Sequence, residues 1–154
     1  MPRANLRDAT IVFDLDGTLV DTAPDLTNAL NDALTRRGYA AISQEPIRSA
    51  VGFGARVMIE EALRRAGAAQ DIDEMLAEFL VHYEANIAAE GRPFPGAVAS
   101  LEALAASGAR LAICTNKREY LTRKLLEALG LQHRVLPGAT PSPCRSQTPG
   151  TSRE

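Results

Sequence analysis

The sequence predicts an α/β protein in which an incomplete parallel sheet carries an inserted all-helical domain. An apolar run, residues 11–13, leads into two carboxylates, and a second apolar run, Ala109–Thr115, ends in a hydroxyl. Most of residues 20–92, which lie between these runs, have helical spacing of apolar residues. Because a crossover between parallel strands needs only about a dozen residues, this long helical stretch indicates a domain inserted within another.

The composition is that of a soluble globular protein, with 154 residues, 45% hydrophobic and 23% charged residues and a net charge of −2. No basic stripe suggests nucleic acid, and no apolar run approaches the roughly 20 residues that span a bilayer. The N-terminus has no long apolar segment, so no secretory signal is expected. Cys114 and Cys144 lack metal-site spacing and are interpreted as reduced thiols of a cytoplasmic protein. No pattern indicates an oligomeric state.

The first apolar run is predicted to be a buried strand that ends at Asp14 and Asp16. Unpaired charges at the edge of a core are costly, so a chemical role is the better explanation. In open α/β sheets, ligands bind at the carboxyl ends of the strands, and carboxylates two residues apart leave an extended backbone on the same side. Such a pair can share Mg²⁺, while one carboxylate attacks phosphorus and the other handles the proton.

Residues 20–92 are expected to form four helices. Thr22 and Asp25 have capping-box spacing at the first helix, which Gly38 ends. The second helix is expected to begin at Ser43, the third to end at Gly67, and the fourth to run from Asp71 to about Gly91.

The loop at residues 51–56, VGFGAR, follows the second of these helices. Arg56 could bind a substrate carboxylate through its guanidinium fork, or it could be a solvated arginine in the first turn of a helix. Gly52 and Gly54 could be hinge or turn residues without ligand contact.

The second strand is followed by Thr115, Asn116 and Lys117, which are expected to open the last helix. A hydroxyl and backbone amides at this place make a phosphate site, although a plain helix cap explains the same residues. Residues 91–96, GRPFPG, are expected to be a stiff return linker, followed by a helix that stops at Gly108.

DLDGTLVDT, residues 14–22, resembles the first signature of the haloacid dehalogenase-like (HAD) superfamily in its phosphatase form. The resemblance implies a Rossmann-like core and a helical cap whose loop at 51–56 contacts substrate. It also implies that Asp14 is the nucleophile that becomes an aspartyl phosphate. Asp16 would protonate the leaving alcohol and later activate water, and its backbone carbonyl would help to hold Mg²⁺. Thr115 resembles the second motif, which binds the transferring phosphoryl group together with the backbone N–H of Asn116.

The resemblance covers about residues 8–136, and two of the four family motifs are present. The implied domains are a core of residues 1–19 and 93–136, a cap of residues 20–92, and an irregular or disordered tail at 137–154. The later Lys-Pro and Gly-Asp-x-x-x-Asp motifs are missing, and Lys117 is not assigned the role of the later lysine. The tail is read as a frameshift or truncation, with a natural short protein as the alternative, and an open sheet edge is expected.

The sequence therefore predicts a magnesium-dependent phosphomonoester hydrolase that acts on a small phosphorylated metabolite. Because the later lysine and acids are missing, the 154-residue chain is expected to have little or no activity. The alternative is a catalytically impaired fragment or pseudoenzyme that binds a phosphorylated ligand or a partner. A phosphoacceptor receiver domain is disfavoured, because it has no large helical insertion after its first strand.

Overall fold

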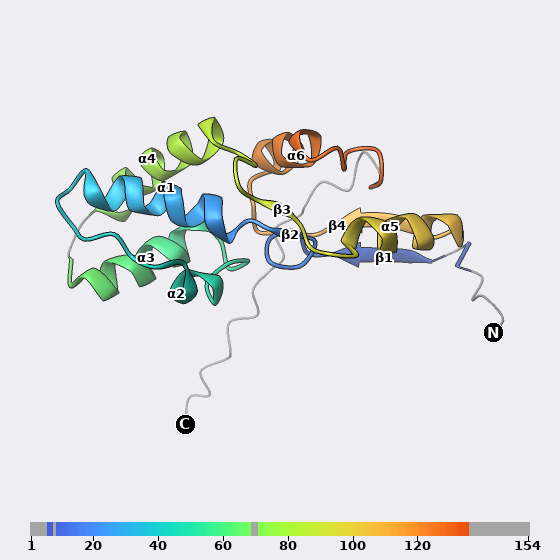
Figure 1. The fold of residues 1–154 in the computed structure, drawn as a ribbon, viewed down its shortest axis with the longest axis horizontal. Coiled ribbons are helices and arrows are strands. Elements are labelled where there is room, and N and C mark those ends of the chain that lie inside the picture. The colour runs from blue at the N-terminus through green and yellow to red at the C-terminus, as the bar shows by residue number, and fades with distance from the viewer. Residues whose placement is uncertain (1–5, 8, 69–70, 136–154) are drawn as a thin grey trace, which may run out of the picture.

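The structure is a computed structural model that describes residues 6–7, 9–68 and 71–135. The expected tail at 137–154 lies outside these residues. Two groups of elements are arranged along the long axis of the molecule, one helical and one built on strands (Figure 1). No helix in the described part of the chain combines the length and apolar character needed to cross a membrane.

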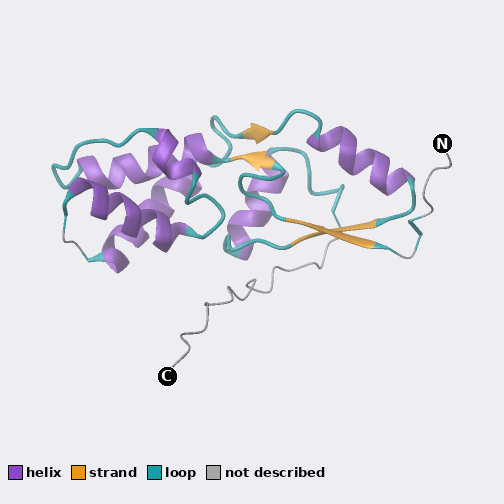
Figure 2. Ribbon diagram, turned by 90° about the horizontal axis from the view of Figure 1, so that it is seen from below, coloured by secondary structure: helices purple, strands orange, loops and turns teal. Residues whose placement is uncertain are grey.

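The strand-containing group holds a short parallel sheet. It consists of β1 (Thr10–Phe13), β4 (Arg110–Ile113), α5 (Ala97–Ala106) and α6 (Glu119–Ala128). β1 and β4 pair in parallel, with Phe13 opposite Ile113, and the two strands cross in the view of Figure 2. The cluster of buried side chains beside them comes from the strands, both helices and the segment after β1, and includes Leu15, Leu101, Leu111 and Leu125.

The prediction that residues 11–13 form a buried strand is wrong in one respect. The Val12 side chain is 58% exposed, and within the described residues β1 pairs only with β4. Parallel strands are buried when both faces of their sheet are covered, and this small sheet leaves one side of Val12 open. The incomplete parallel sheet that the sequence predicts is present.

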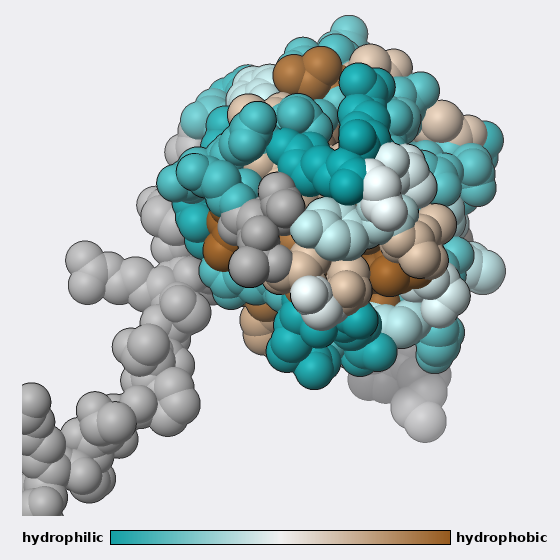
Figure 3. Space-filling model, turned by 90° about the vertical axis from the view of Figure 1, so that its left-hand side faces the viewer, coloured by the Kyte–Doolittle hydropathy of each residue, from teal (hydrophilic) through white to brown (hydrophobic). Residues whose placement is uncertain are grey.

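The four expected helices form the second group, the helical block. They are α1 (Ala23–Thr35), α2 (Gln44–Arg48), α3 (Ala55–Ala66) and α4 (Ile72–Ala85). The apolar faces of these helices meet in a separate hydrophobic cluster that includes Leu30, Ile59 and Phe79. The outer end of the block is mainly hydrophilic, with small separate hydrophobic groups, as expected for a surface in water (Figure 3).

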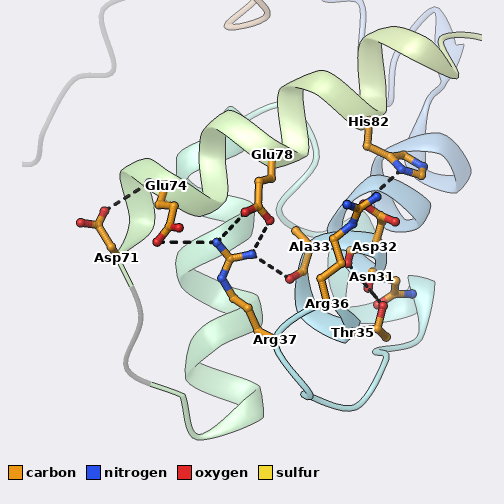
Figure 4. A network of polar contacts seen from close by, with 10 residues as sticks. All are labelled: Asn31, Asp32, Ala33, Thr35, Arg36, Arg37, Asp71, Glu74, Glu78 and His82. Carbon is orange, nitrogen blue, oxygen red and sulfur yellow. Dashed lines mark hydrogen bonds and ion pairs between the residues drawn. The ribbon is translucent and has the colours of Figure 1, made fainter.

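Polar contacts on the surface of the block join α1 and the turn that follows it to α4 (Figure 4). Arg37 forms ion pairs with Glu78 and, at 3.8 Å, with Glu74. His82 Nδ1 of α4 lies 3.3 Å from Asp32 Oδ2 of α1. Ion pairs of this kind at a surface contribute little each, so the apolar cluster is the main source of stability of the block.

Two short strands, β2 (Val20–Asp21) and β3 (Arg92–Pro93), connect the two groups as an antiparallel pair. The sequence predicted a linker at residues 91–96 and assigned residues 20–21 to the helical insertion; it predicted neither strand, because two-residue strands have no periodicity to detect. Asp25 reinforces the junction: its buried carboxylate accepts hydrogen bonds from the backbone N–H groups of Glu90 (2.8 Å) and Gly91 (2.9 Å). A β-carbon at position 91 would lie 2.8 Å from Asp25 Oδ2, so only glycine fits.

Candidate active site

The carboxyl ends of β1 and β4 bring the predicted site residues to one edge of the sheet. Asp14 directly follows β1, and Thr115 lies two residues beyond β4. The parallel register continues past the strands, because the Cys114 backbone N–H donates to the Phe13 carbonyl at 2.8 Å. Thr115 is 3% exposed and Asp16 is 7% exposed, so both polar side chains lie within the packed interior.

Asp14 is held by its own backbone and faces the loop at 51–56. Its Oδ1 accepts a hydrogen bond of 2.7 Å from the Leu15 N–H. Burial raises the pKa of Asp14, and the neighbouring Asp16 charge adds to the rise, whereas the Leu15 N–H and the Lys117 charge oppose it. A β-carbon added at Gly52 would lie 3.5 Å from Asp14 Oδ2, which places this oxygen directly beneath the loop.

Asp16 has two partners on the same oxygen. The Thr22 hydroxyl donates to Asp16 Oδ1 at 2.7 Å, and Lys117 Nζ lies 3.1 Å from that oxygen. The capping box predicted from Thr22 and Asp25 is therefore wrong, since Thr22 forms no side-chain cap at α1. Thr22 contacts Asp16, six residues earlier, and Asp25 contacts Glu90 and Gly91, so the local spacing of a capping box reveals neither contact.

Lys117 is the site residue whose position the sequence did not reveal. Its side chain is 6% exposed, and Nζ donates to the Tyr83 hydroxyl at 3.0 Å and lies 4.4 Å from the centre of that ring. Burial alone would lower the pKa of Lys117, but the Asp16 carboxylate and Tyr83 outweigh burial, so the pKa is raised. Lys117 therefore links Asp16 to α4 of the helical block. The only feature of the sequence that indicated a place at the site for Lys117 was its position two residues after Thr115.

The sequence predicted that the segment after β4 opens a helix at Thr115, and this prediction is wrong. α6 begins at Glu119, so Thr115 is not its cap. The Thr115 Oγ1 instead accepts a hydrogen bond of 3.2 Å from the Lys117 N–H, and Asn116 Nδ2 donates to the Gly52 carbonyl at 2.7 Å. Asn116 thus ties the loop at 51–56 to the end of the sheet. Gly52 has φ +95°, a conformation that suits glycine alone.

A pocket of about 290 Å³ lies next to Asp16, between the helical block and α6. Arg56 lines this pocket together with Phe79 and Leu121. Its guanidinium also forms an ion pair with Asp73 of α4, and the two side chains are 51% and 78% exposed. Arg56 is therefore at the pocket but is already engaged with a carboxylate.

The oxygens at the strand end fit the needs of a magnesium ion. Asp14 Oδ2 and the Asp16 backbone carbonyl lie 3.5 and 3.7 Å from the place that a Gly52 β-carbon would take, so both face one small space. In the described part of the chain, no group of three or more His, Cys, Asp or Glu side chains could hold a metal. Two protein oxygens are nevertheless a usual set for Mg²⁺, which keeps several waters and binds substrate phosphate.

Residues 11–136 match the family of haloacid dehalogenase-like hydrolases. The chain belongs to this family. A phosphoglycolate phosphatase of Agrobacterium fabrum is 47% identical over 123 residues, which are 78% of this chain and 53% of that protein. One of Caulobacter vibrioides is 45% identical over 130 residues, 82% of this chain and 55% of that protein. The chain thus spans about half the length of these relatives.

Solved structures of HAD proteins have the same fold. A predicted phosphoglycolate phosphatase from Haemophilus somnus superposes with a TM-score of 0.76 at 29% identity, over 87% of this chain and 62% of that one. A putative phosphoglycolate phosphatase from Lactobacillus delbrueckii superposes with a TM-score of 0.74 at 26% identity, over 82% of this chain and 62% of that one. The α/β fold class predicted from the sequence is therefore confirmed.

Proposed function

We propose that this HAD chain forms the nucleophile-bearing part of a phosphomonoester hydrolase that acts on phosphoglycolate or a similar small phosphorylated metabolite. The observation that carries the proposal is the arrangement of Asp14, Asp16 and Thr115 at one sheet edge, beneath the loop at Gly52. The names of the relatives support the choice of substrate. In this proposal, residues 20–92 are a cap that covers the site, and β2 and β3 are its hinges.

The proposed reaction has two steps. Asp14 Oδ2, which faces the loop, attacks phosphorus; the bond from phosphorus to the alcohol oxygen breaks, and that oxygen takes a proton from Asp16. Water then attacks the aspartyl phosphate, and Asp16 accepts its proton, which releases phosphate and restores Asp14. The Thr115 hydroxyl and the Asn116 backbone N–H bind the phosphoryl oxygens, and Arg56 remains a proposed substrate-binding residue at the pocket.

Mg²⁺ would be held by the Asp14 carboxylate and the Asp16 backbone carbonyl, with the Asp16 side chain close by. When bound, the ion supplies positive charge that neutralises the phosphate oxygens. The Lys117 ammonium, 3.1 Å from Asp16, adds a second positive charge at the same place. This charge matters because the Asp14 carboxylate would otherwise repel the anionic phosphate of the substrate.

The test is phosphate release from phosphoglycolate by the full chain in the presence of Mg²⁺, compared with an Asp14→Asn variant. Because the Lys-Pro and Gly-Asp-x-x-x-Asp motifs are missing from the 154 residues, we expect turnover below ~1 per second. Any release that remains should be lost in the variant. Release that is equal in both proteins would contradict the role of Asp14.

The second candidate function is a catalytically impaired protein that binds a phosphorylated ligand or partner. The missing motifs favour it. Calorimetric titration of the full chain with phosphoglycolate separates the two candidates: binding with no detectable release supports the second, and measurable release that depends on Asp14 supports the first.

A further inference from the structure

Three cationic side chains, those of Arg56, Lys117 and Arg118, line the pocket next to Asp16. Two of them already have carboxylate partners: Arg56 pairs with Asp73, and Lys117 pairs with Asp16 at 3.1 Å. Within the described residues, the Arg118 guanidinium has neither an ion pair nor a hydrogen bond. It is therefore the pocket cation that is available to an anionic ligand.

Arg118 is also placed close to the proposed phosphate site. It follows Thr115 by three residues, so their Cα atoms are at most about 11 Å apart. An arginine side chain can extend over much of that distance. Asn116, which lies between them, is fixed by its 2.7 Å hydrogen bond to Gly52, so the backbone that presents Arg118 is held in place.

We propose that Arg118 binds the carboxylate of the substrate while the phosphate lies at Thr115. This inference rests on the proposed function. Phosphoglycolate has a carboxylate one carbon away from its phosphate ester oxygen, and a guanidinium fork can bind a carboxylate through two parallel hydrogen bonds. Arg118 belongs to the same segment as Thr115, so its contact does not require movement of the helical block. For Arg56, on α3, to bind the substrate carboxylate, the helical block would have to lie in a suitable position and Arg56 would have to release Asp73.

The other residues of the pocket explain why the substrate carboxylate needs a cationic partner there. Leu76, Phe79 and Leu121 supply apolar surface to the same pocket. An ionised carboxylate would not be placed against these side chains without a partner, because burying an unpaired charge is costly. Arg118 thus selects a short phosphomonoester that also carries a carboxylate over an alkyl phosphate of similar size that lacks one.

The experiment is calorimetric titration of the full chain with Mg²⁺, using phosphoglycolate and ethyl phosphate as ligands. Ethyl phosphate is also a two-carbon phosphomonoester but lacks the carboxylate. We expect phosphoglycolate to bind at least about tenfold more tightly, as one charge-assisted contact predicts. Arg118→Gln should reduce this ratio to about one, and Arg118→Lys, which keeps the charge but not the fork, should give an intermediate ratio.

Two further variants control the result. Arg123→Gln removes an arginine of α6, the helix that Arg118 precedes; Arg123 pairs with Glu119, and the variant should leave the ratio unchanged. Loss of the ratio in Arg56→Gln but not in Arg118→Gln would overturn the proposal in favour of Arg56. Equal binding of both ligands by the unaltered chain would overturn the role of Arg118 alone. Binding of neither ligand would overturn the proposed function and this inference together.

Discussion

Replacing Asp25 by Asn should destabilise the junction between the two groups of elements. The Asp25 carboxylate is 3% exposed and accepts the N–H groups of Glu90 and Gly91 at 2.8 and 2.9 Å. Asparagine has the same size but only one acceptor oxygen, so one N–H would face the new NH₂ group. Loss of one hydrogen bond to a charged acceptor costs about 1.5–3 kcal/mol, and the unsatisfied N–H adds a comparable penalty. We therefore expect a loss of about 3–6 kcal/mol.

The measurement is urea unfolding of the full chain followed by circular dichroism, with the free energy of unfolding extrapolated to water. Asp32→Asn is the matched control. Asp32 lies on the same helix, α1, but its partners Arg36 and His82 are at the surface (Figure 4), so its replacement should cost no more than about 1 kcal/mol. If the two variants lose the same stability, the argument that Asp25 clamps the junction is refuted.

Two further predictions concern the loop and the hinge. Gly52→Ala should weaken phosphoglycolate binding at least about tenfold in calorimetry, because alanine is strained at φ +95° and its methyl group would occupy the space beside Asp14 Oδ2. The control is Gly38→Ala, at a position with φ +79° and open space around it. An equal loss of binding in the two variants would contradict the proposed role of the Gly52 loop. Hydrogen bonding from Arg48 holds the pKa of Asp21 in the folded chain below its ordinary value of 3.8. The pair of Asp21 and Arg48 therefore contributes its full stability above pH 3.8, and this contribution is lost as the pH falls through the pKa of Asp21 in the folded chain. The stability advantage over Asp21→Asn should therefore be present at about pH 6 and shrink towards about pH 2.5 in urea unfolding; an advantage independent of pH would refute the prediction.

Local patterns in the sequence predicted most of the fold. The four helices of the block and both strands of the parallel sheet were found, because helical and strand periodicities depend on near neighbours. The pair of Asp14 and Asp16 was also readable, since two acids directly after an apolar strand have few structural explanations. The short pair of β2 and β3 was missed, because strands of two residues leave no periodic signal.

The local sequence also determined which residues could take part in the chemistry, but the tertiary structure decided what each one contacts. Thr22 and Asp25 have the spacing of a helix cap, yet Thr22 binds Asp16 and Asp25 binds a segment 65 residues later in the chain. From the sequence alone, Lys117 could have been a solvated lysine. In the structure, the position of α4 places Tyr83 beside it, and its charge is buried against Asp16. The physical reason is that the cost of burying a charge is met by partners, and those partners come from segments that only packing brings together.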